Sequence, residues 1–188
     1  MIPFYAPKAK SIVDVTCNER RIWAGTNFKV LGIDIDERVK PDIVADFNDL
    51  RDILPKHSVD LVIFDPPHLS HRSSTLKSWN SRFGLKVFDE GWTAVSKMFE
   101  GFFKEASRYM ARDGIVFAKI CDPVNGRKYH WQHIDLILAG RAFGFTPCDL
   151  IVKTRKNGVI RSSRWIRSHH ARKHHSFWII FRNGKKCQ

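Results

Sequence analysis

The sequence predicts an α/β protein with a mostly parallel sheet that is covered by helices on both faces. Apolar runs alternate with segments of helical spacing along the 188 residues. Those runs are almost continuously hydrophobic, which is typical of strands buried on both faces of a parallel sheet. The length and the hydrophobic content of 43% suit one folded domain, residues 1–188, and no internal repeat is visible.

Seven apolar runs are expected to be strands. They are Ser11–Cys17, Phe28–Asp36, Pro41–Phe47, Val59–Asp65, Gly114–Ile120, Cys148–Lys156 and Ser176–Asn183. Glu90–Arg112 has helical spacing, and its apolar side carries Trp92, Val95, Phe99, Phe102, Phe103 and Ala106. Trp131–Gly144 predicts an amphipathic helix that stops at glycine, and Asn48–Pro55 predicts about two helical turns.

Acidic residues stand at the ends of four expected strands, at Asp14–Cys17, Asp34–Asp36, Asp46 and Asp65–His68. In parallel sheets the carboxyl ends of strands share one edge, where ligands bind. One or two such acids would serve as helix caps, but four exceed what a fold needs. Asp34 is placed to bind the two hydroxyls of a ribose, although it could also solvate a loop together with Asp36.

The sequence lacks the glycine-rich loops that cradle phosphates. After Cys17 come Asn18, Glu19, Arg20 and Arg21 in place of GxGxxG, and no GxxxxGK[ST] loop is present. These absences disfavour a cofactor held by pyrophosphate or triphosphate and leave a nucleoside-type cofactor open. Asn18 tolerates positive φ, so the tight turn can form without glycine.

Positive charge is concentrated near the end of the chain. Residues 1–150 hold 21 Lys and Arg against 19 Asp and Glu, whereas residues 151–188 hold 11 Lys and Arg and no acid. Such density attracts phosphates, and the interleaved Trp165 adds a stacking surface. A solubilising or non-specific anion-binding tail is the alternative.

Four short stretches carry a resemblance to a known family. "SIVDVTC", "GIDID", "VADFNDL" and "VIFDPPH", in this order, resemble class I S-adenosylmethionine-dependent methyltransferases. Asp-Pro-Pro followed by a residue with a ring is similar to the motif of the amino-methyltransferases that act on adenine or cytosine. It is also similar to the motif of some RNA guanine or adenine N-methyltransferases. Small phage-like DNA methylases share the DPPH box, the stretch from Trp79 to Gly84, and the box from His170 to Trp178.

The resemblance implies a single-domain Rossmann-like methyltransferase fold, with a seven-stranded sheet whose last strand is antiparallel. It implies S-adenosyl-L-methionine as cofactor, with Asp14 and Thr16 against the methionine part, Asp34 on the ribose, and Asp46 with Phe47 facing the adenine. The implied cofactor site comprises Asp14, Thr16, Cys17, Asn18, Asp34, Asp46 and Phe47.

The implied catalytic residues are Asp65, Pro66, Pro67 and His68. An exocyclic amine is a poor nucleophile because its lone pair is delocalised into the base. Asp65 and a carbonyl of the Asp-Pro-Pro box would accept its two N–H groups, and proline holds these acceptors rigid. His68, which stands where Tyr, Phe or Trp is usual, would stack on the base. The alternative is an Asp-initiated turn with proline at its second position.

An antiparallel last strand would project the basic insertion 154–175 over the active-site edge. We therefore expect nucleic acid to contact its residues Arg161, Arg164, Arg167, Arg172 and Lys173, and the opposite wall just after the DPPH box is expected to comprise Arg72, Lys77, Trp79 and Arg82. A target base inside a duplex would have to be flipped out.

Other chemistries are less well supported. The pairs His169–His170 and His174–His175 could bind zinc, but adjacent histidines point apart and the cysteines lack ligand spacing, so no metal is expected. Cys121 could be a nucleophile for carbon-5 methylation, but the Asp-Pro-Pro box argues against that reaction.

The cysteines also bear on localisation. All four are scattered and favour free thiols in a reducing compartment. No signal peptide and no apolar run of about 18 residues is visible, so we expect a cytoplasmic protein without membrane contact.

Three functions remain. N-methylation of adenine or cytosine in DNA comes first, and the same chemistry on RNA is second. The third is a non-catalytic nucleic-acid-binding protein on a degenerate methyltransferase fold. The oligomeric state is left open.

Overall fold

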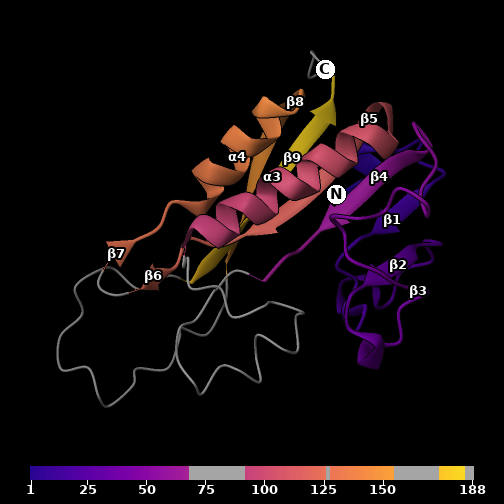
Figure 1. Ribbon diagram of the computed structural model, residues 1–188, viewed down its shortest axis with the longest axis horizontal. Helices are drawn as coiled ribbons and strands as arrows, with labels where there is room; N and C mark the ends of the chain where they lie inside the picture. The colour runs from indigo at the N-terminus through magenta and orange to yellow at the C-terminus, as the bar shows by residue number, and fades with distance from the viewer. Residues whose placement is uncertain (68–91, 126–127, 155–173, 185–188) are drawn as a thin grey trace.

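A computed structural model describes residues 1–67, 92–125, 128–154 and 174–184. Its main sheet has seven strands in the order β3-β2-β1-β4-β5-β9-β8 (Figure 1). The strands are β1 (Ile12–Asp14), β2 (Leu31–Asp34), β3 (Ile43–Val44), β4 (Val59–Phe64), β5 (Met110–Ile120), β8 (Phe145–Thr154) and β9 (His175–Asn183). Two further strands, β6 (Val124–Asn125) and β7 (Lys128–Tyr129), pair only with each other.

The directions of the strands determine which strand ends meet at one edge of the sheet. Strands β1 to β5 of the main sheet run parallel, whereas β9 is antiparallel to both β5 and β8. The seven strands and the antiparallel last strand are confirmed. The carboxyl ends of β1, β2, β4 and β5 therefore meet the start of β9 at one edge, which we call the rim.

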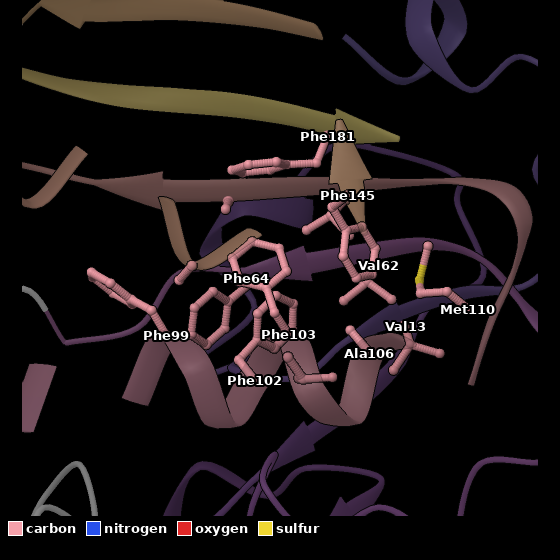
Figure 2. Packing of buried hydrophobic residues seen from close by; sticks show 14 of the residues in the cluster. Val13, Val62, Phe64, Phe99, Phe102, Phe103, Ala106, Met110, Phe145 and Phe181 are labelled. Atoms are coloured by element: carbon pink, nitrogen blue, oxygen red, sulfur yellow. The ribbon is translucent and has the colours of Figure 1, made fainter. Parts of the chain in front are cut away.

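One face of the sheet packs on the two long helices, α3 (Trp92–Tyr109) and α4 (Gln132–Ala142), which lie side by side over it (Figure 1). Alternate residues of each strand point to this face, so Val62 and Phe64 of β4 join the helices' apolar side chains. Phe64 stacks on Phe102 of α3 with ring centroids 3.8 Å apart (Figure 2). The apolar side predicted for α3 is confirmed at its described side chains, which are Val95, Phe99, Phe102, Phe103 and Ala106.

In the described part of the chain, the second face is covered by the N-terminal segment. Leu61, Ile63, Phe117 and Ile180 point there and pack on the N-terminal segment, which includes Ile2 and Tyr5 of the short helix α1 (Ile2–Tyr5). Among the described residues, α1 is the only α-helix on this face, so the expectation of helices on both faces is met only by one short helix.

Two local predictions are wrong. Residues 48–55 form hydrogen-bonded turns in place of a helix, because a single helical turn that ends at Pro55 does not repay the cost of helix nucleation. Cys148 is disulfide-bonded, whereas Cys17 is a free cysteine. Scattered cysteine spacing therefore did not indicate the redox state of every thiol.

No helix in the described part of the chain is both long enough and apolar enough to cross a membrane.

Candidate active site

Asp14 ends β1 as a buried carboxylate inside the rim. Its Oδ1 accepts a hydrogen bond from the Thr16 amide at 3.1 Å, and its Oδ2 accepts one from Trp23 Nε1 at 2.7 Å. Burial, with smaller contributions from the negative charges of Asp65 and Asp34, raises the pKa of Asp14 to about 6 against the effect of these two donors. Asp14 therefore titrates close to neutral pH.

The loop after β1 makes a tight turn without glycine. Asn18 has φ of 44° and Arg20 has φ of 55°, both in the left-handed region that glycine usually occupies. The backbone bond from Cys17 N to Ile33 O, at 3.1 Å, ties this loop to β2. The positive φ that the sequence allowed at Asn18 is thus present.

Asp34 at the end of β2 faces this turn. Its Oδ2 accepts from the Asn18 amide at 2.8 Å, and its Oδ1 accepts from the Asp36 amide at 3.0 Å. The two predicted cofactor loops therefore meet at one carboxylate. Cys17 is also part of this junction, but its side chain is buried, and burial raises the pKa of its thiol to about 12. Any cofactor contact by Cys17 would come from its backbone.

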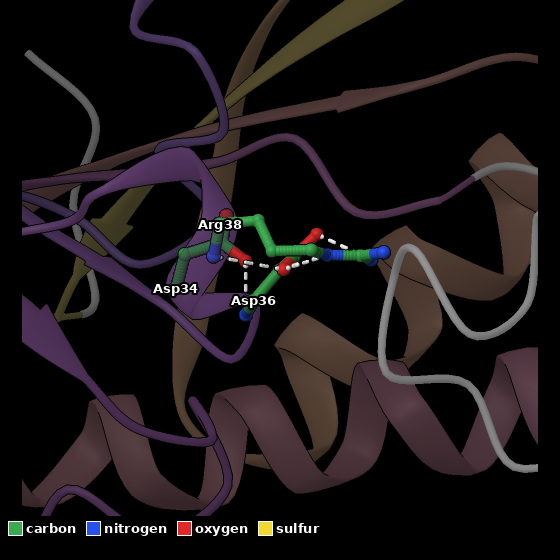
Figure 3. A network of polar contacts seen from close by, with 3 residues as sticks. All are labelled: Asp34, Asp36 and Arg38. Carbon is green, nitrogen blue, oxygen red and sulfur yellow. Dashed lines mark hydrogen bonds and ion pairs between the residues drawn. The ribbon is translucent and has the colours of Figure 1, made fainter.

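Asp36 has a structural role in this region. Its carboxylate caps the short helix η2 (Glu37–Val39) through the Arg38 amide and pairs with the Arg38 guanidinium at 2.7 and 2.8 Å (Figure 3). Because Arg38 neutralises Asp36, Asp34 is the stronger candidate for binding ribose hydroxyls.

Asp46 and Phe47 follow β3. Asp46 is exposed, and its Oδ1 accepts from the amide and the side-chain nitrogen of Asn48. Phe47 is partly buried and meets Phe64 edge-on, with ring centroids 5.3 Å apart. Phe47 is therefore a core ring at the margin of the predicted adenine position.

Asp65 lies directly after β4, and two residues hold it in place. Its amide donates to Thr16 Oγ1 at 2.7 Å, and its Oδ2 accepts from Lys119 Nζ at 2.6 Å. Both charged side chains are about one-fifth exposed, at 22% for Asp65 and 19% for Lys119. The structure thus brings Asp65 beside the loop after β1, as the sequence predicted. Pro66 is buried and Pro67 is half-buried next to it.

Lys119 is a site residue that the sequence reasoning missed. Phe64 pairs with Ala118 in the sheet, so the residues that follow, Asp65 and Lys119, lie next to each other. Lys119 Nζ also lies 5.7 Å from the ring centroid of Trp178, its cross-strand neighbour on β9. The available signal was a single cation inside the apolar run "GIVFAKI".

Asp122 was also missed, although "CDP" after β5 repeats the pattern of "FDP" after β4. This buried carboxylate accepts from Tyr129 OH at 2.9 Å, His133 N at 3.0 Å and His133 Nδ1 at 2.6 Å. Burial, together with the hydrogen bond to Asp122 and its charge, raises the pKa of Tyr129 to about 12. Asp122 and its partners form a second polar centre on the rim.

Several predicted site residues lie outside the described residues. These are His68, Arg72, Lys77, Trp79, Arg82, Arg161, Arg164, Arg167, Arg172 and Lys173. Within residues 1–67, 92–125, 128–154 and 174–184, no group of three or more His, Cys, Asp or Glu side chains is arranged to hold a metal ion.

No protein-family model and no curated protein matches the chain. Solved structures do match it in fold. An S-adenosylmethionine-dependent methyltransferase from Methanosarcina mazei is 13% identical, with a TM-score of 0.56, over 94% of this chain and 93% of that one. Another from Archaeoglobus fulgidus is 12% identical, with a TM-score of 0.56, over 96% of this chain and 89% of that one.

A candidate DNA modification methylase from Thermus thermophilus, complexed with S-adenosyl-L-methionine, is 14% identical, with a TM-score of 0.50. That match covers 95% of this chain but 57% of the Thermus chain, so this chain spans little more than half of its length. Together these similarities show that the chain has the fold of S-adenosylmethionine-dependent methyltransferases.

Proposed function

We propose that this protein is an S-adenosylmethionine-dependent N-methyltransferase that acts on the exocyclic amino group of adenine or cytosine in DNA. One observation carries the proposal: the amide of Asp65 donates to Thr16 Oγ1 at 2.7 Å. This contact joins the Asp-Pro-Pro box to the loop that the resemblance assigns to the cofactor. A methyl donor and its acceptor need that proximity.

The residues at the ends of β1 and β2 fit S-adenosyl-L-methionine. Asp34 keeps acceptor capacity beyond the two amides it binds, because a carboxylate has about four lone-pair sites, and ribose hydroxyls can use the rest. Asp14 supplies negative charge near the amino end of a bound amino acid. When bound, the cofactor supplies a methyl group on a sulfonium, which needs positioning more than activation.

Asp65 then has the role of hydrogen-bond acceptor for the target amine. Accepting one N–H draws the nitrogen out of the plane of the base and localises its lone pair. Pro66 and Pro67 restrict the backbone, so a carbonyl of this box is held ready to accept the second N–H. These acceptors need no reorganisation during the reaction, which is the main source of rate enhancement that we assign to the chain.

Lys119 completes this arrangement from β5. Its ammonium group holds Asp65 Oδ2 at 2.6 Å and so fixes the carboxylate plane. The target amine then approaches a carboxylate whose orientation is already set. Lys119 is therefore a positioning residue, and it also neutralises charge beside a cationic donor site.

Nucleic acid is the proposed substrate class because of the charge near the end of the chain. Residues 151–188 carry 11 Lys and Arg and no acid, and the Asp-Pro-Pro box suits a base amine. The box from His170 to Trp178 favours DNA through its resemblance to phage-like DNA methylases. Such an enzyme would act in the cytoplasm.

The decisive experiment is incubation with tritiated S-adenosyl-L-methionine and separate DNA and RNA pools. Nucleoside mass spectrometry then identifies the product, and we expect N6-methyladenine or N4-methylcytosine in the DNA pool. Label found only in the RNA pool would mean that RNA is the substrate of the same reaction. Calorimetry without any heat of cofactor binding at millimolar concentration would favour a degenerate, non-catalytic fold.

The basic segment has its own test. Neutralising Arg161, Arg164 and Arg167 together should weaken polynucleotide binding. It should also make the slope of log affinity against log salt less negative by about 2 to 3. An unchanged slope would remove these arginines from the interface.

A further inference from the structure

Five aromatic rings form a continuous series at the rim, beside the proposed active site. They come from β7, the start of α4 and the start of β9: Tyr129, Trp131, His133, Phe177 and His175. Their successive ring centroids are 4.5, 6.0, 4.8 and 5.0 Å apart. We call this series the ring ladder.

The ring ladder is exposed at Trp131, which is 57% exposed. A large apolar ring is usually buried in a core, and this one instead presents most of its surface to solvent at the N-cap of α4. Its inner side meets Tyr129 edge-on. An indole in this position offers a surface for a planar ligand.

Asp122 holds the inner part of the ring ladder in place. A carboxylate only accepts, so the 2.6 Å contact fixes the proton of His133 on Nδ1 and leaves Nε2 as the remaining polar atom of that ring. The same carboxylate binds Tyr129 OH and the His133 amide near the start of α4, where negative charge is favourable. Both rings that flank Trp131 are therefore fixed by one buried group.

Two neighbouring residues of β9 connect the ring ladder to the proposed target site. Phe177 pairs with Ile120 of β5 and belongs to the ring ladder, whereas Trp178 pairs with Lys119, the partner of Asp65. Side chains alternate along a strand, so the ring ladder lies on the α3–α4 side and Lys119 on the other side of the same rim.

We propose that the ring ladder binds an unstacked nucleotide of single-stranded or locally opened DNA, on the same strand as the base held at Asp65. Trp131 stacks on the base of that nucleotide, and His133 Nε2 contacts a polar atom of the same nucleotide. Stacking suits any base, so this site contributes affinity more than sequence preference. The inference rests on the proposed function for the identity of the bound target, but not for binding itself.

The test is fluorescence anisotropy with a labelled single-stranded DNA, compared with the fully paired duplex of the same sequence. Trp131→Ala should weaken single-strand binding by roughly 5- to 100-fold, the range that one base-stacking contact supports. Trp131→Phe should retain most of the affinity. Because Trp131 is exposed, all variants are expected to fold, and circular dichroism checks this.

Leu138→Ala is the matched control. Leu138 is also 57% exposed and lies on α4, seven residues beyond Trp131, so its loss tests whether any apolar surface on this helix has the same effect. We expect wild-type affinity for Leu138→Ala. Equal loss in both variants, or no loss in Trp131→Ala, would overturn the proposal, and so would a loss seen with RNA but not with DNA.

The outcome separates this inference from the proposed function. If Trp131→Ala loses DNA binding while no pool is methylated, the ring ladder binds nucleotides and the assigned chemistry fails. If DNA is methylated and Trp131→Ala binds and reacts like the wild type, the chemistry holds and the ring ladder is not a binding site.

Discussion

The two halves of the rim organise their carboxylates in different ways. In the loops after β1 and β2, Asp34 accepts from the backbone amides of Asn18 and Asp36, and Asp14 accepts from the Thr16 amide and from the nearby Trp23 Nε1. After β4 and β5, Asp65 and Asp122 pair with the side chains of Lys119 and His133, at separations of 54 and 11 residues. We call these the amide-bound half and the side-chain-bound half.

This difference bears on how each half works. Amides are fixed by the backbone, so the amide-bound half presents a preformed surface that suits a constant ligand such as a cofactor. In the side-chain-bound half, Lys119 of β5 and His133 of α4 orient Asp65 and Asp122, which suits a half that must align a substrate with the methyl donor. Mutations should therefore affect the stability of the fold mainly in the first half and turnover mainly in the second.

The largest effect is expected at Asp65. Asp65→Ala should lower the rate of methyl transfer by roughly 100- to 1000-fold, because it removes a preorganised acceptor, while cofactor binding stays nearly intact. Asp60→Ala is the control, since Asp60 lies at the other end of β4 and accepts from the amides of Lys10 and Ser11. A wild-type rate in Asp65→Ala would reject its assigned role.

Asp14 should make the stability of the fold depend on pH. Its pKa is raised to about 6 from 3.8, so the folded state binds the proton more tightly than the unfolded state. The stabilisation is full below the unfolded value and is lost as pH rises to about 6, a change of about 3 kcal/mol. Denaturant unfolding of the wild type and Asp14→Asn at several pH values measures this contribution of Asp14 to the free energy of unfolding.

Cofactor affinity should respond in the opposite direction. Protonation of Asp14 below about pH 6 removes charge near the proposed methionine position, so binding weakens where the fold becomes more stable. Calorimetry across this range provides the measurement. If affinity and stability instead changed in the same direction with pH, Asp14 would not contribute to cofactor binding.

Lys119→Met tests the side-chain-bound half more finely. The substitution keeps the length of the side chain and removes the ammonium group that fixes Asp65 Oδ2, so turnover should fall roughly 10- to 100-fold, as expected for losing a hydrogen bond to a charged group. Lys104→Met, at an exposed position on α3, is the control. Single-turnover rates that match the wild type would show that Asp65 needs no positioning from β5.

The smallest effect is expected at Asn18. Asn18→Ala should cost about 1 kcal/mol of unfolding free energy, because alanine tolerates the φ of 44° poorly, whereas Asn18→Gly should be nearly neutral. Thermal unfolding of both variants is sufficient. Equal losses for glycine and alanine would mean that the side chain of Asn18, which accepts from the Glu19 amide at 2.8 Å, supports the turn more than its backbone conformation does.

The features that could be predicted from the sequence are those set by local residues, and the features that could not are those set by contacts between distant residues. The strands, the apolar side of α3 and the positive φ of Asn18 depend on local periodicity and on single-residue conformational preference, and the sequence reasoning found them. Lys119 and His133 gain their roles only when the sheet and α4 bring them to Asp65 and Asp122, so their types and spacing carried little signal. The expected helix at 48–55 failed although Leu50 and Leu54 are buried, because a segment this short, ending at Pro55, does not repay the cost of helix nucleation.

The hydroxyl of Thr16 has one further consequence. It accepts the Asp65 amide, so the loop after β1 and the tip of β4 lose conformational freedom together. A ligand that orders one of them lowers the entropic cost of ordering the other, and such linkage is reciprocal. Donor and acceptor should therefore bind synergistically, each tightening the other by the same factor, with a single hydroxyl as the physical coupling between them.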